Sequence, residues 1–363
     1  MAWVKLGTTA IFDLSLINVN KKFNRRDFLK GASLAPLCAA SGLPFLATPG
    51  NALEPIKREG GPKLKIALNA YSFARPLNDH LRGRGAGITL FDLLDFCVKY
   101  DFEALDATGY YFPGYGSLRE GNKGIPTDQY VFDLKRRAFE LGIEISGTGV
   151  QNDFATTDKE KRAADVRHVK QWVEVAAKLG APVLRIFAGP IPEGYEKKWE
   201  EVAAWMTADF RTCAEYAAKY GVMIGVQNHG DMLQTADQVI KVIKMVNSPW
   251  FGAINDTGYY VSKDPYDDMA QVVPYTVNWQ VKERLGGKDG KAPMDLKRLM
   301  GLIKAGGYRG YIPIETLSGG GGGKQAKAEK VVAKASPESP AYDPFERVPI
   351  FLKQVRQALA ETA

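Results

Sequence analysis

Four segments of this sequence place polar side chains at the ends of apolar runs, and their residue types can hold a cation or move a proton. They are Gln227-Asn228-His229, Asp256-Thr257-Gly258, Glu315-Thr316, and the alternating set Asn278, Gln280 and Lys282. Carboxylates act as bases or metal ligands, amide oxygens are weaker ligands, and lysine and histidine donate protons. Together they indicate proton-transfer chemistry or cation binding.

The run 276–282 shows which side chains share a face. Asn278, Gln280 and Lys282 alternate with apolar residues, so in a strand all three lie on one side. The apolar set belongs under covering helices, and the polar set is therefore expected to point inward. By the same reasoning Arg185 and Phe187 of the run 182–188 also point inward.

The elements that must position these residues alternate along the chain. Strands are expected at 65–73, 102–110, 143–148, 182–188, 223–228, 251–256, 276–282 and 311–315. Helices are expected at 90–99, 128–141, 158–179, 199–220, 236–246, 265–272, 295–305 and 345–359. Eight strand–helix units with short returns predict an α/β fold, a single (β/α)8 TIM barrel. A doubly wound open sheet would favour a glycine-rich first turn, which Ala70-Tyr71-Ser72-Phe73 is not.

The first 52 residues are expected to be a targeting segment rather than part of the folded domain. The segment Asn24-Arg25-Arg26-Asp27-Phe28-Leu29-Lys30 resembles the twin-arginine export motif, and a short apolar stretch follows it. Small residues at Gly50 and Ala52 offer a peptidase site. We therefore expect a twin-arginine signal peptide at 1–52 and a barrel at 53–363. The mature protein would be periplasmic or otherwise exported.

Composition argues against a nucleic-acid partner. The 363 residues carry a formal charge of +7, from 48 Lys and Arg and 41 Asp and Glu. Six of the basic and two of the acidic residues lie in 1–52, which leaves 42 against 39 for the rest. This nearly balanced charge does not imply a surface that binds the phosphate backbone of a nucleic acid. Beyond the leader only Cys97 and Cys213 remain, and both are expected in the core.

The segment 318–342 departs from the strand–helix rhythm. It contains five consecutive glycines and continues through Lys, Ala, Ser and Pro, which is typical of a flexible tether. Following the eighth strand, it is expected over the barrel mouth as a lid or entry loop. It does not match a phosphate loop, because Gln325 stands where Ser or Thr should hold magnesium.

Across residues 63 to 360 the chain resembles the sugar phosphate isomerase/epimerase group of the xylose isomerase-like barrels. The resemblance lies in an Asn-His-Gly turn, an Asp-Thr-Gly turn, an inward lysine and a glutamate that ends the eighth strand. Members of that family usually hold one divalent metal with Glu, Asp, His and Glu. The matching positions are Gln227, Asp256, Gln280 and Glu315. Two amides replace stronger ligands, so the resemblance implies a loosely held Mg, Mn or Ca ion rather than Zn.

The function implied by the resemblance is metal-assisted proton transfer next to a carbonyl. Glu315 would be the base, and Lys282 or His229 would supply the second group. Family epimerases use two opposed glutamates, and Gln227 replaces the first. A β-eliminating lyase acting on oxidised keto-glycosides is therefore an alternative, as is a sugar-binding barrel without catalysis. An abasic-site endonuclease needs a multi-zinc cluster, which three histidines in all cannot supply.

Aromatic residues near the strand ends favour a sugar ligand. Tyr71, Tyr110 and Tyr259 are expected to pack on it, with Arg185 and Asn228 bonding its oxygens. Structural alternatives stay open, since Arg185 is also suited to internal ion pairs. A non-phosphorylated carbohydrate is the expected partner, without nucleic acid or a stable membrane anchor. The oligomeric state is left open, a homodimer included.

Overall fold

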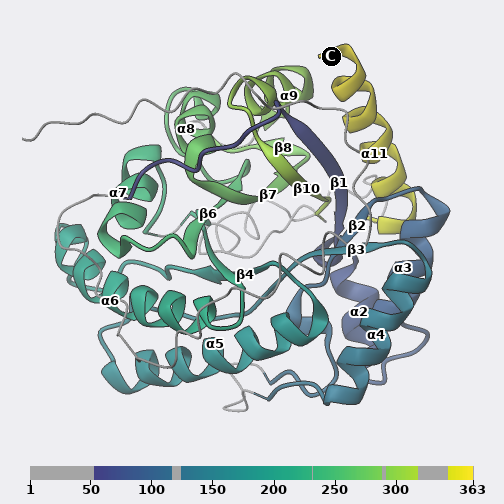
Figure 1. The fold of residues 1–363 in the computed structure, drawn as a ribbon, viewed down its shortest axis with the longest axis horizontal. Coiled ribbons are helices and arrows are strands. Elements are labelled where there is room, and N and C mark those ends of the chain that lie inside the picture. The colour runs from purple at the N-terminus through teal and green to yellow at the C-terminus, as the bar shows by residue number, and fades with distance from the viewer. Residues whose placement is uncertain (1–52, 117–123, 231, 288–291, 318–341, 363) are drawn as a thin grey trace, which may run out of the picture. The chain divides into compact units, whose positions relative to one another are not determined.

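The computed structural model describes residues 53–116, 124–230, 232–287, 292–317 and 342–362. The expected export leader and nearly all of the glycine-rich segment 318–342 lie outside these residues. The export signal and the lid therefore stay predictions. The described residues form the barrel that the alternation predicts (Figure 1).

Eight parallel strands close into a barrel in the order β1-β10-β7-β6-β5-β4-β3-β2. The strands are β1 (Lys63–Asn69), β2 (Ala104–Asp106), β3 (Glu144–Gly149), β4 (Val183–Phe187), β5 (Met223–Gln227), β6 (Phe251–Asp256), β7 (Thr276–Lys282) and β10 (Arg309–Glu315). Pairing of β1 with both β2 and β10 closes the sheet, so that all eight carboxyl ends meet at one rim.

Helices surround the barrel in chain order. They are α2 (Ala74–Leu81), α3 (Leu90–Lys99), α4 (Asp128–Glu140), α5 (Lys159–Leu179), α6 (Trp199–Ala218), α7 (Ala236–Val246), α8 (Pro265–Val272), α9 (Leu296–Ala305) and α11 (Pro344–Glu361). The ring closes where α11 returns to α3, with the Phe345 and Phe96 rings 6.1 Å apart (Figure 1).

Local sequence signals fix the helix ends. Thr89 forms a capping box with Asp92, and Thr235 forms one with Gln238, as the threonines before these helices predict. Gly180 ends α5 with a φ of +85°, a left-handed conformation that suits glycine and turns the chain into the next strand.

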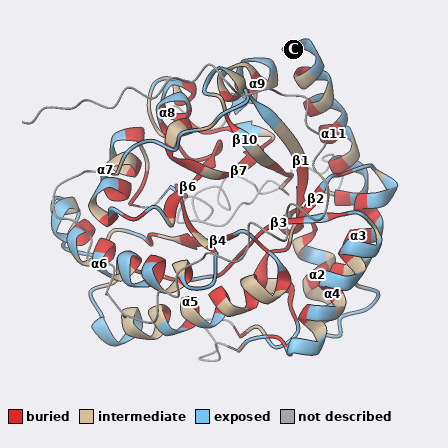
Figure 2. Ribbon diagram, viewed as in Figure 1, coloured by how far each residue is buried: buried red, intermediate tan, exposed pale blue. Residues whose placement is uncertain are grey.

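The main core lies between the strands and the helices. Figure 2 shows buried residues on the strands and on the helix sides that face them, with exposed residues outside. Trp279, an outward residue of β7, is fully buried with its ring 6.0 Å from that of Tyr308. Cys97 and Cys213 are buried free thiols, as expected. This packing confirms the outward assignment of the apolar set.

Two of the expected strands end four residues earlier in the structure. β1 ends at Asn69, whose side chain accepts a hydrogen bond from the Tyr71 N–H at 2.7 Å and turns the chain into η1 (Ala70–Phe73) and then α2. β2 stops at Asp106, where the register with β3 shifts, and η2 (Gly109–Tyr111) follows. The small pair β8 (Arg284–Leu285) and β9 (Ala292–Pro293) is an addition that the sequence pattern does not indicate.

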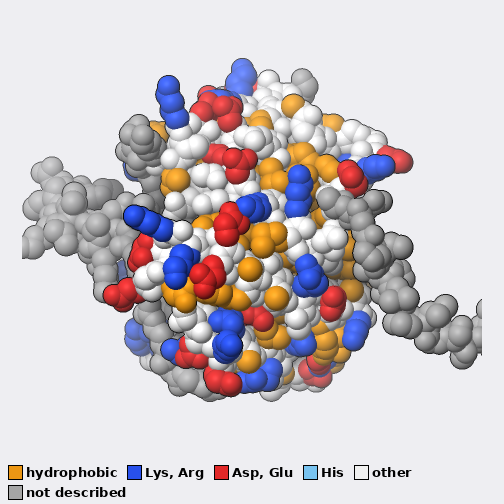
Figure 3. All heavy atoms as spheres, turned by 90° about the vertical axis from the view of Figure 1, so that its left-hand side faces the viewer, with side chains coloured by type: hydrophobic (Ala, Val, Ile, Leu, Met, Phe, Trp, Pro, Cys, Tyr) orange, Lys and Arg blue, Asp and Glu red, His pale blue; other side chains and the backbone are white. Residues whose placement is uncertain are grey.

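One outer face of the barrel is mixed in charge. On the face shown in Figure 3, Lys and Arg side chains are intermingled with Asp and Glu. None of the helices in the described part of the chain is long and apolar enough to cross a membrane.

Candidate active site

The rim formed by the carboxyl ends of the strands brings the predicted polar residues together. Lys282 of β7 is the register partner of Glu315 of β10, and Gln280 is the partner of Asp256 of β6. Gln227 ends β5 beside β6. Sequence positions 88 residues apart thus become neighbours on one side of the barrel mouth.

Lys282 lies between two buried carboxylates. Its Nζ is 2.5 Å from Oε1 of Glu315 and 3.5 Å from Oδ2 of Asp256. Lys282 and Glu315 are each 4% exposed, and Asp256 is fully buried. Burial by itself would lower the pKa of Lys282, but the two carboxylates raise it above its ordinary value. The lysine is therefore a fixed positive charge.

Both predicted amide ligands turn their nitrogens toward the carboxylates. Nε2 of Gln227 donates to Oδ2 of Asp256 at 2.5 Å, and Nε2 of Gln280 donates to Oε2 of Glu315. The opposite amide orientation would set a carbonyl oxygen against a carboxylate oxygen, which repels. Each glutamine thus serves as a hydrogen-bond donor to one carboxylate.

Asn228, expected to bond a sugar, pairs its side-chain amide with the backbone of Asp256. Its Oδ1 accepts from the Asp256 N–H at 2.8 Å, and its Nδ2 donates to the Asp256 carbonyl at 3.0 Å. The side chain is 1% exposed. Asn228 therefore fixes the end of β6 and positions Asp256. Thr257 acts similarly on Lys282, whose N–H donates to Oγ1 of Thr257 at 2.9 Å.

Arg185 of β4 places a second positive charge at the rim, across the barrel mouth from Lys282 of β7. Its guanidinium donates to the Tyr110 hydroxyl at 2.8 Å and to the Val150 carbonyl at 2.7 Å, and it lies 4.1 Å from the centre of the Phe187 ring. A side chain at Gly149 would stand 2.6 Å from Nε, so glycine there makes room for the arginine. Inward placement of Arg185 and Phe187 agrees with the alternation.

Aromatic rings contact one another and both cations at the rim. His229 lies between Phe187 and Tyr259, with centroids 4.7 Å and 4.2 Å away. The Tyr259 ring is also 5.4 Å from Nζ of Lys282. Tyr71 meets Tyr110 edge to face at 6.4 Å. His229 thus occurs in an aromatic stack beside the lysine, and Tyr71, Tyr110 and Tyr259 line the rim as expected.

Asp106 is an inward carboxylate that the sequence reasoning missed. A Cβ on Gly147 would stand 2.8 Å from its Oδ2 and 3.2 Å from Nδ2 of Asn278, so Asp106 points across the interior of the barrel. Burial raises its pKa to about 6, Arg185 partly opposes this, and Glu315 adds to it. Its position at a strand end was the available signal, but the expected strand 102–110 ran past it.

The donor set does not fit a divalent cation. Of the four aligned residues only Asp256 and Glu315 carry a carboxylate, and Gln227 and Gln280 are neutral amides. The two carboxylates already share the ammonium of Lys282, and the two glutamines offer N–H groups to those carboxylates. A divalent ion would set three positive charges against two negative ones in a buried place. The four predicted ligands do converge, but their contacts are those of an ion-pair network.

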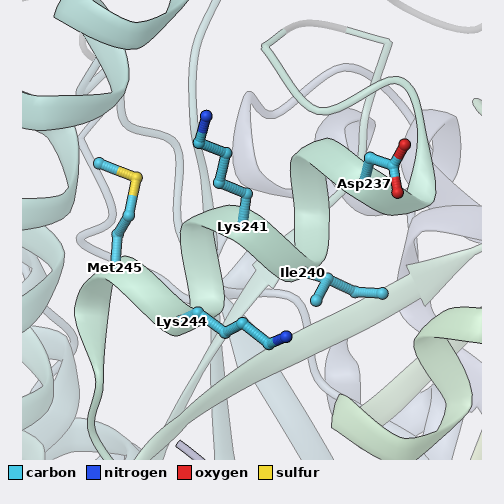
Figure 4. Close-up of a pocket in the computed structure, with 5 residues that line it drawn as sticks. All are labelled: Asp237, Ile240, Lys241, Lys244 and Met245. Atoms are coloured by element: carbon cyan, nitrogen blue, oxygen red, sulfur yellow. The ribbon is translucent and has the colours of Figure 1, made fainter. Parts of the chain in front are cut away.

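A pocket on the outer side of α7 is separate from this rim. It is lined by Asp237, Ile240, Lys241, Lys244 and Met245 (Figure 4). These residues lie on the side of α7 away from its buried residues Val239, Val242 and Ile243. The pocket therefore has no share in the chemistry of the strand ends.

Comparison with known proteins agrees with the fold. Residues 102–336 match the family described as xylose isomerase-like TIM barrel. The structure of D-psicose 3-epimerase with D-tagatose from Clostridium cellulolyticum H10 aligns with a TM-score of 0.63 and 14% identity, covering 81% of this chain and 99% of that one. An L-ribulose 3-epimerase aligns at 0.59 and 14% identity, covering 82% and 95%. The IolI protein with a bound zinc atom aligns at 0.59 and 12% identity, covering 82% and 99%. No curated protein matches the sequence.

Proposed function

Because this chain belongs to the xylose isomerase-like TIM barrel family, we propose that it is a sugar isomerase or epimerase acting by proton transfer next to a carbonyl. Its substrate would be a non-phosphorylated sugar or keto-sugar, such as the D-psicose and D-tagatose named for a structural neighbour. The observation that carries the proposal is the contact of Glu315 with Lys282, a base beside a fixed cation, at the rim where such barrels hold their active sites.

The proposed reaction begins with the removal of one carbon-bound proton. The carboxylate of Glu315 takes the proton from the carbon next to the substrate carbonyl, and the C–H electron pair forms a carbon–carbon double bond. The carbonyl π electrons move to oxygen, and the ammonium of Lys282 donates a hydrogen bond to the resulting oxyanion. In isomerisation, Glu315 returns the proton to the former carbonyl carbon, while the neighbouring hydroxyl passes its proton to the oxyanion and becomes the new carbonyl. In epimerisation, a second group, here His229, delivers a proton to the opposite face of the carbon that lost it. The family resemblance implies metal assistance, but the steps proposed here involve no metal ion.

Substrate contacts would come from the aromatic rim. Tyr71, Tyr110 and Tyr259 offer ring faces to the C–H faces of a sugar, and the guanidinium of Arg185 offers N–H groups to its oxygens. His229 beside Tyr259 is the proposed second proton carrier. The non-phosphorylated substrate follows from the export signal expected at 1–52, because sugar phosphates are kept inside the cell.

A β-eliminating lyase is the second candidate, favoured by one observation. Gln227 donates an N–H to Asp256 and cannot act as a second carboxylate base. Elimination from a keto-glycoside needs one carbon base and one acid for the leaving oxygen. Asp106, with its pKa raised to about 6 by burial, is suited to protonate that oxygen while Glu315 takes the carbon-bound proton. The glycosidic C–O pair then leaves with the departing group.

Product analysis tests these candidates together. The mature protein would be incubated with free ketoses, with the matching sugar phosphates and with a 3-keto-glycoside, and products followed by NMR. A new epimer or aldose from a free ketose supports the first candidate, and a released aglycone with an unsaturated sugar supports the second. Faster turnover of a sugar phosphate than of its free sugar would contradict the proposed substrate class. Binding of a ketose without any turnover would contradict both reactions.

A further inference from the structure

We propose that the ammonium of Lys282 takes the place of a divalent metal, so that the site carries its own cation. The inference rests on the proposed function for its chemical meaning, but its geometry stands apart from any substrate. It concerns how the negative charge of the reacting oxygen is balanced in this chain.

The first argument is position. Nζ of Lys282 touches Oε1 of Glu315 at 2.5 Å and lies 3.5 Å from Oδ2 of Asp256, so it lies between the two carboxylates among the four aligned positions. Backbone register enforces this, because Lys282 and Glu315 are paired residues of adjacent strands. The backbone N–H of Lys282 also donates a hydrogen bond to Oγ1 of Thr257.

The second argument is the chemistry of the neighbours. Where the family pattern has a glutamate and a histidine, this chain has Gln227 and Gln280. Both are neutral, and both donate an N–H to a carboxylate that Lys282 also contacts. Two carboxylates with one ammonium and two amide donors form a complete hydrogen-bonded set, whereas a divalent ion would displace the lysine or overcharge the site.

The third argument is the space made for the lysine. A Cβ on Gly258 would stand 2.7 Å from Cδ of Lys282, so only glycine leaves its aliphatic part in place. The N–H of Gly258 donates to Oδ1 of Asp256 at 2.8 Å, which turns the other carboxylate oxygen toward the lysine. The loop after β6 is thus shaped around Lys282.

In the proton transfer, the substrate oxygen would receive the hydrogen bond that Nζ gives to Glu315 in the structure. Glu315 is then released to take the carbon-bound proton while the ammonium stabilises the oxyanion. A cation fixed by the chain needs no ion from the medium.

Metal binding, measured without turnover, tests the inference on the full chain. Wild type and Lys282→Met would be stripped with a chelator, dialysed, and titrated with MnCl2 and MgCl2 by calorimetry and thermal shift. Lys241→Met, which removes a surface lysine paired with Glu200, is the matched control. Wild type and control should show no stoichiometric ion and no shift in Tm. Lys282→Met should bind Mn²⁺ at least about tenfold more tightly than wild type does, because one positive charge no longer opposes the ion.

A second variant keeps the test decisive if the single mutant fails to fold. Lys282→Met combined with Gln227→Glu and Gln280→His restores the family donors and should bind the ion tighter still. Wild type that retains about one divalent ion per chain through dialysis, and loses Tm on chelation, would overturn the inference even if the variants fail to fold. That result would leave the proposed function intact. Absence of turnover on every sugar, with metal binding as predicted, would overturn the function and leave the fixed cation standing.

Discussion

Gly258 and Lys282 are fitted to one another across the gap between β6 and β7. The Cα of Gly258 faces the aliphatic chain of Lys282 so closely that a methyl group there would stand 2.7 Å from Cδ and 3.3 Å from Cε. Because the lysine is buried, it cannot swing into solvent to avoid that methyl group. The position of the ammonium therefore depends on a glycine in a loop.

Gly258→Ala should displace Lys282 and reduce turnover with little effect on the fold. A loss of about 10²-fold in kcat is expected, since a displaced charge no longer meets the developing oxyanion. Steady-state kinetics and circular dichroism measure the two quantities.

Gly301→Ala is the matched control for that substitution. Gly301 lies within α9, and no atom lies within 4 Å of its would-be Cβ. The variant should keep full activity and gain about 0.5–1 kcal/mol of stability from helix propensity. Equal activity of Gly258→Ala and Gly301→Ala would show that the Lys282 position does not matter to the reaction.

Asp106 should make stability depend on pH. Burial raises its pKa from the ordinary value of 3.8 to about 6, so the folded chain binds its proton more tightly than the unfolded chain does. Its contribution favours the fold below about pH 4 and is lost as pH rises through 6. Asp106→Asn removes this loss. Relative to wild type, the variant should gain about 2–3 kcal/mol between pH 4 and pH 8.

Urea unfolding of both proteins at pH 4, 6 and 8 measures that difference. A stability difference between variant and wild type that is constant over this range would mean that Asp106 is ionised as easily in the fold as outside it.

Most of the fold could be predicted because period-two and helical patterns are local. The strand at 276–282 and the helix at 236–246 were predicted with the bounds that the structure has. The expected strand at 65–73 was too long, because alternating apolar residues continue through Tyr71 and Phe73. The turn there depends on one side-chain contact of Asn69, which a hydropathy pattern does not record.

The site could be predicted as a set of residues but not as a network. Alternation placed Gln280 and Lys282 inside the barrel, and the strand ends supplied Asp256 and Glu315. That Lys282 would lie between the two carboxylates depends on register between β7 and β10, which are joined through long-range pairing. The bond from the Asn228 amide to the Asp256 carbonyl, 28 positions away, is likewise a long-range contact that the sequence pattern does not record.

Export remains a prediction about residues 1–52. Replacing Arg25 and Arg26 by lysine keeps the charge but removes the paired guanidinium groups that the export motif requires. Uncleaved protein should accumulate in the cytoplasm, as seen by fractionation and mass spectrometry of the amino terminus. Lys21→Arg with Lys22→Arg, upstream of the motif, should export normally. Cleaved protein outside the inner membrane from the Arg25→Lys, Arg26→Lys variant would exclude the twin-arginine route.

The central claim is that Glu315 removes a proton from the carbon next to a sugar carbonyl. Deuterium from D2O, followed by proton NMR of the free ketose that responds to wild type, measures that step before any product forms. Wild type should exchange the proton at one position. Glu315→Gln should slow the exchange by about 10³-fold or more while keeping its Tm within a few degrees. Equal exchange by wild type and Glu315→Gln would contradict the account, because the proton would then be carried by another group.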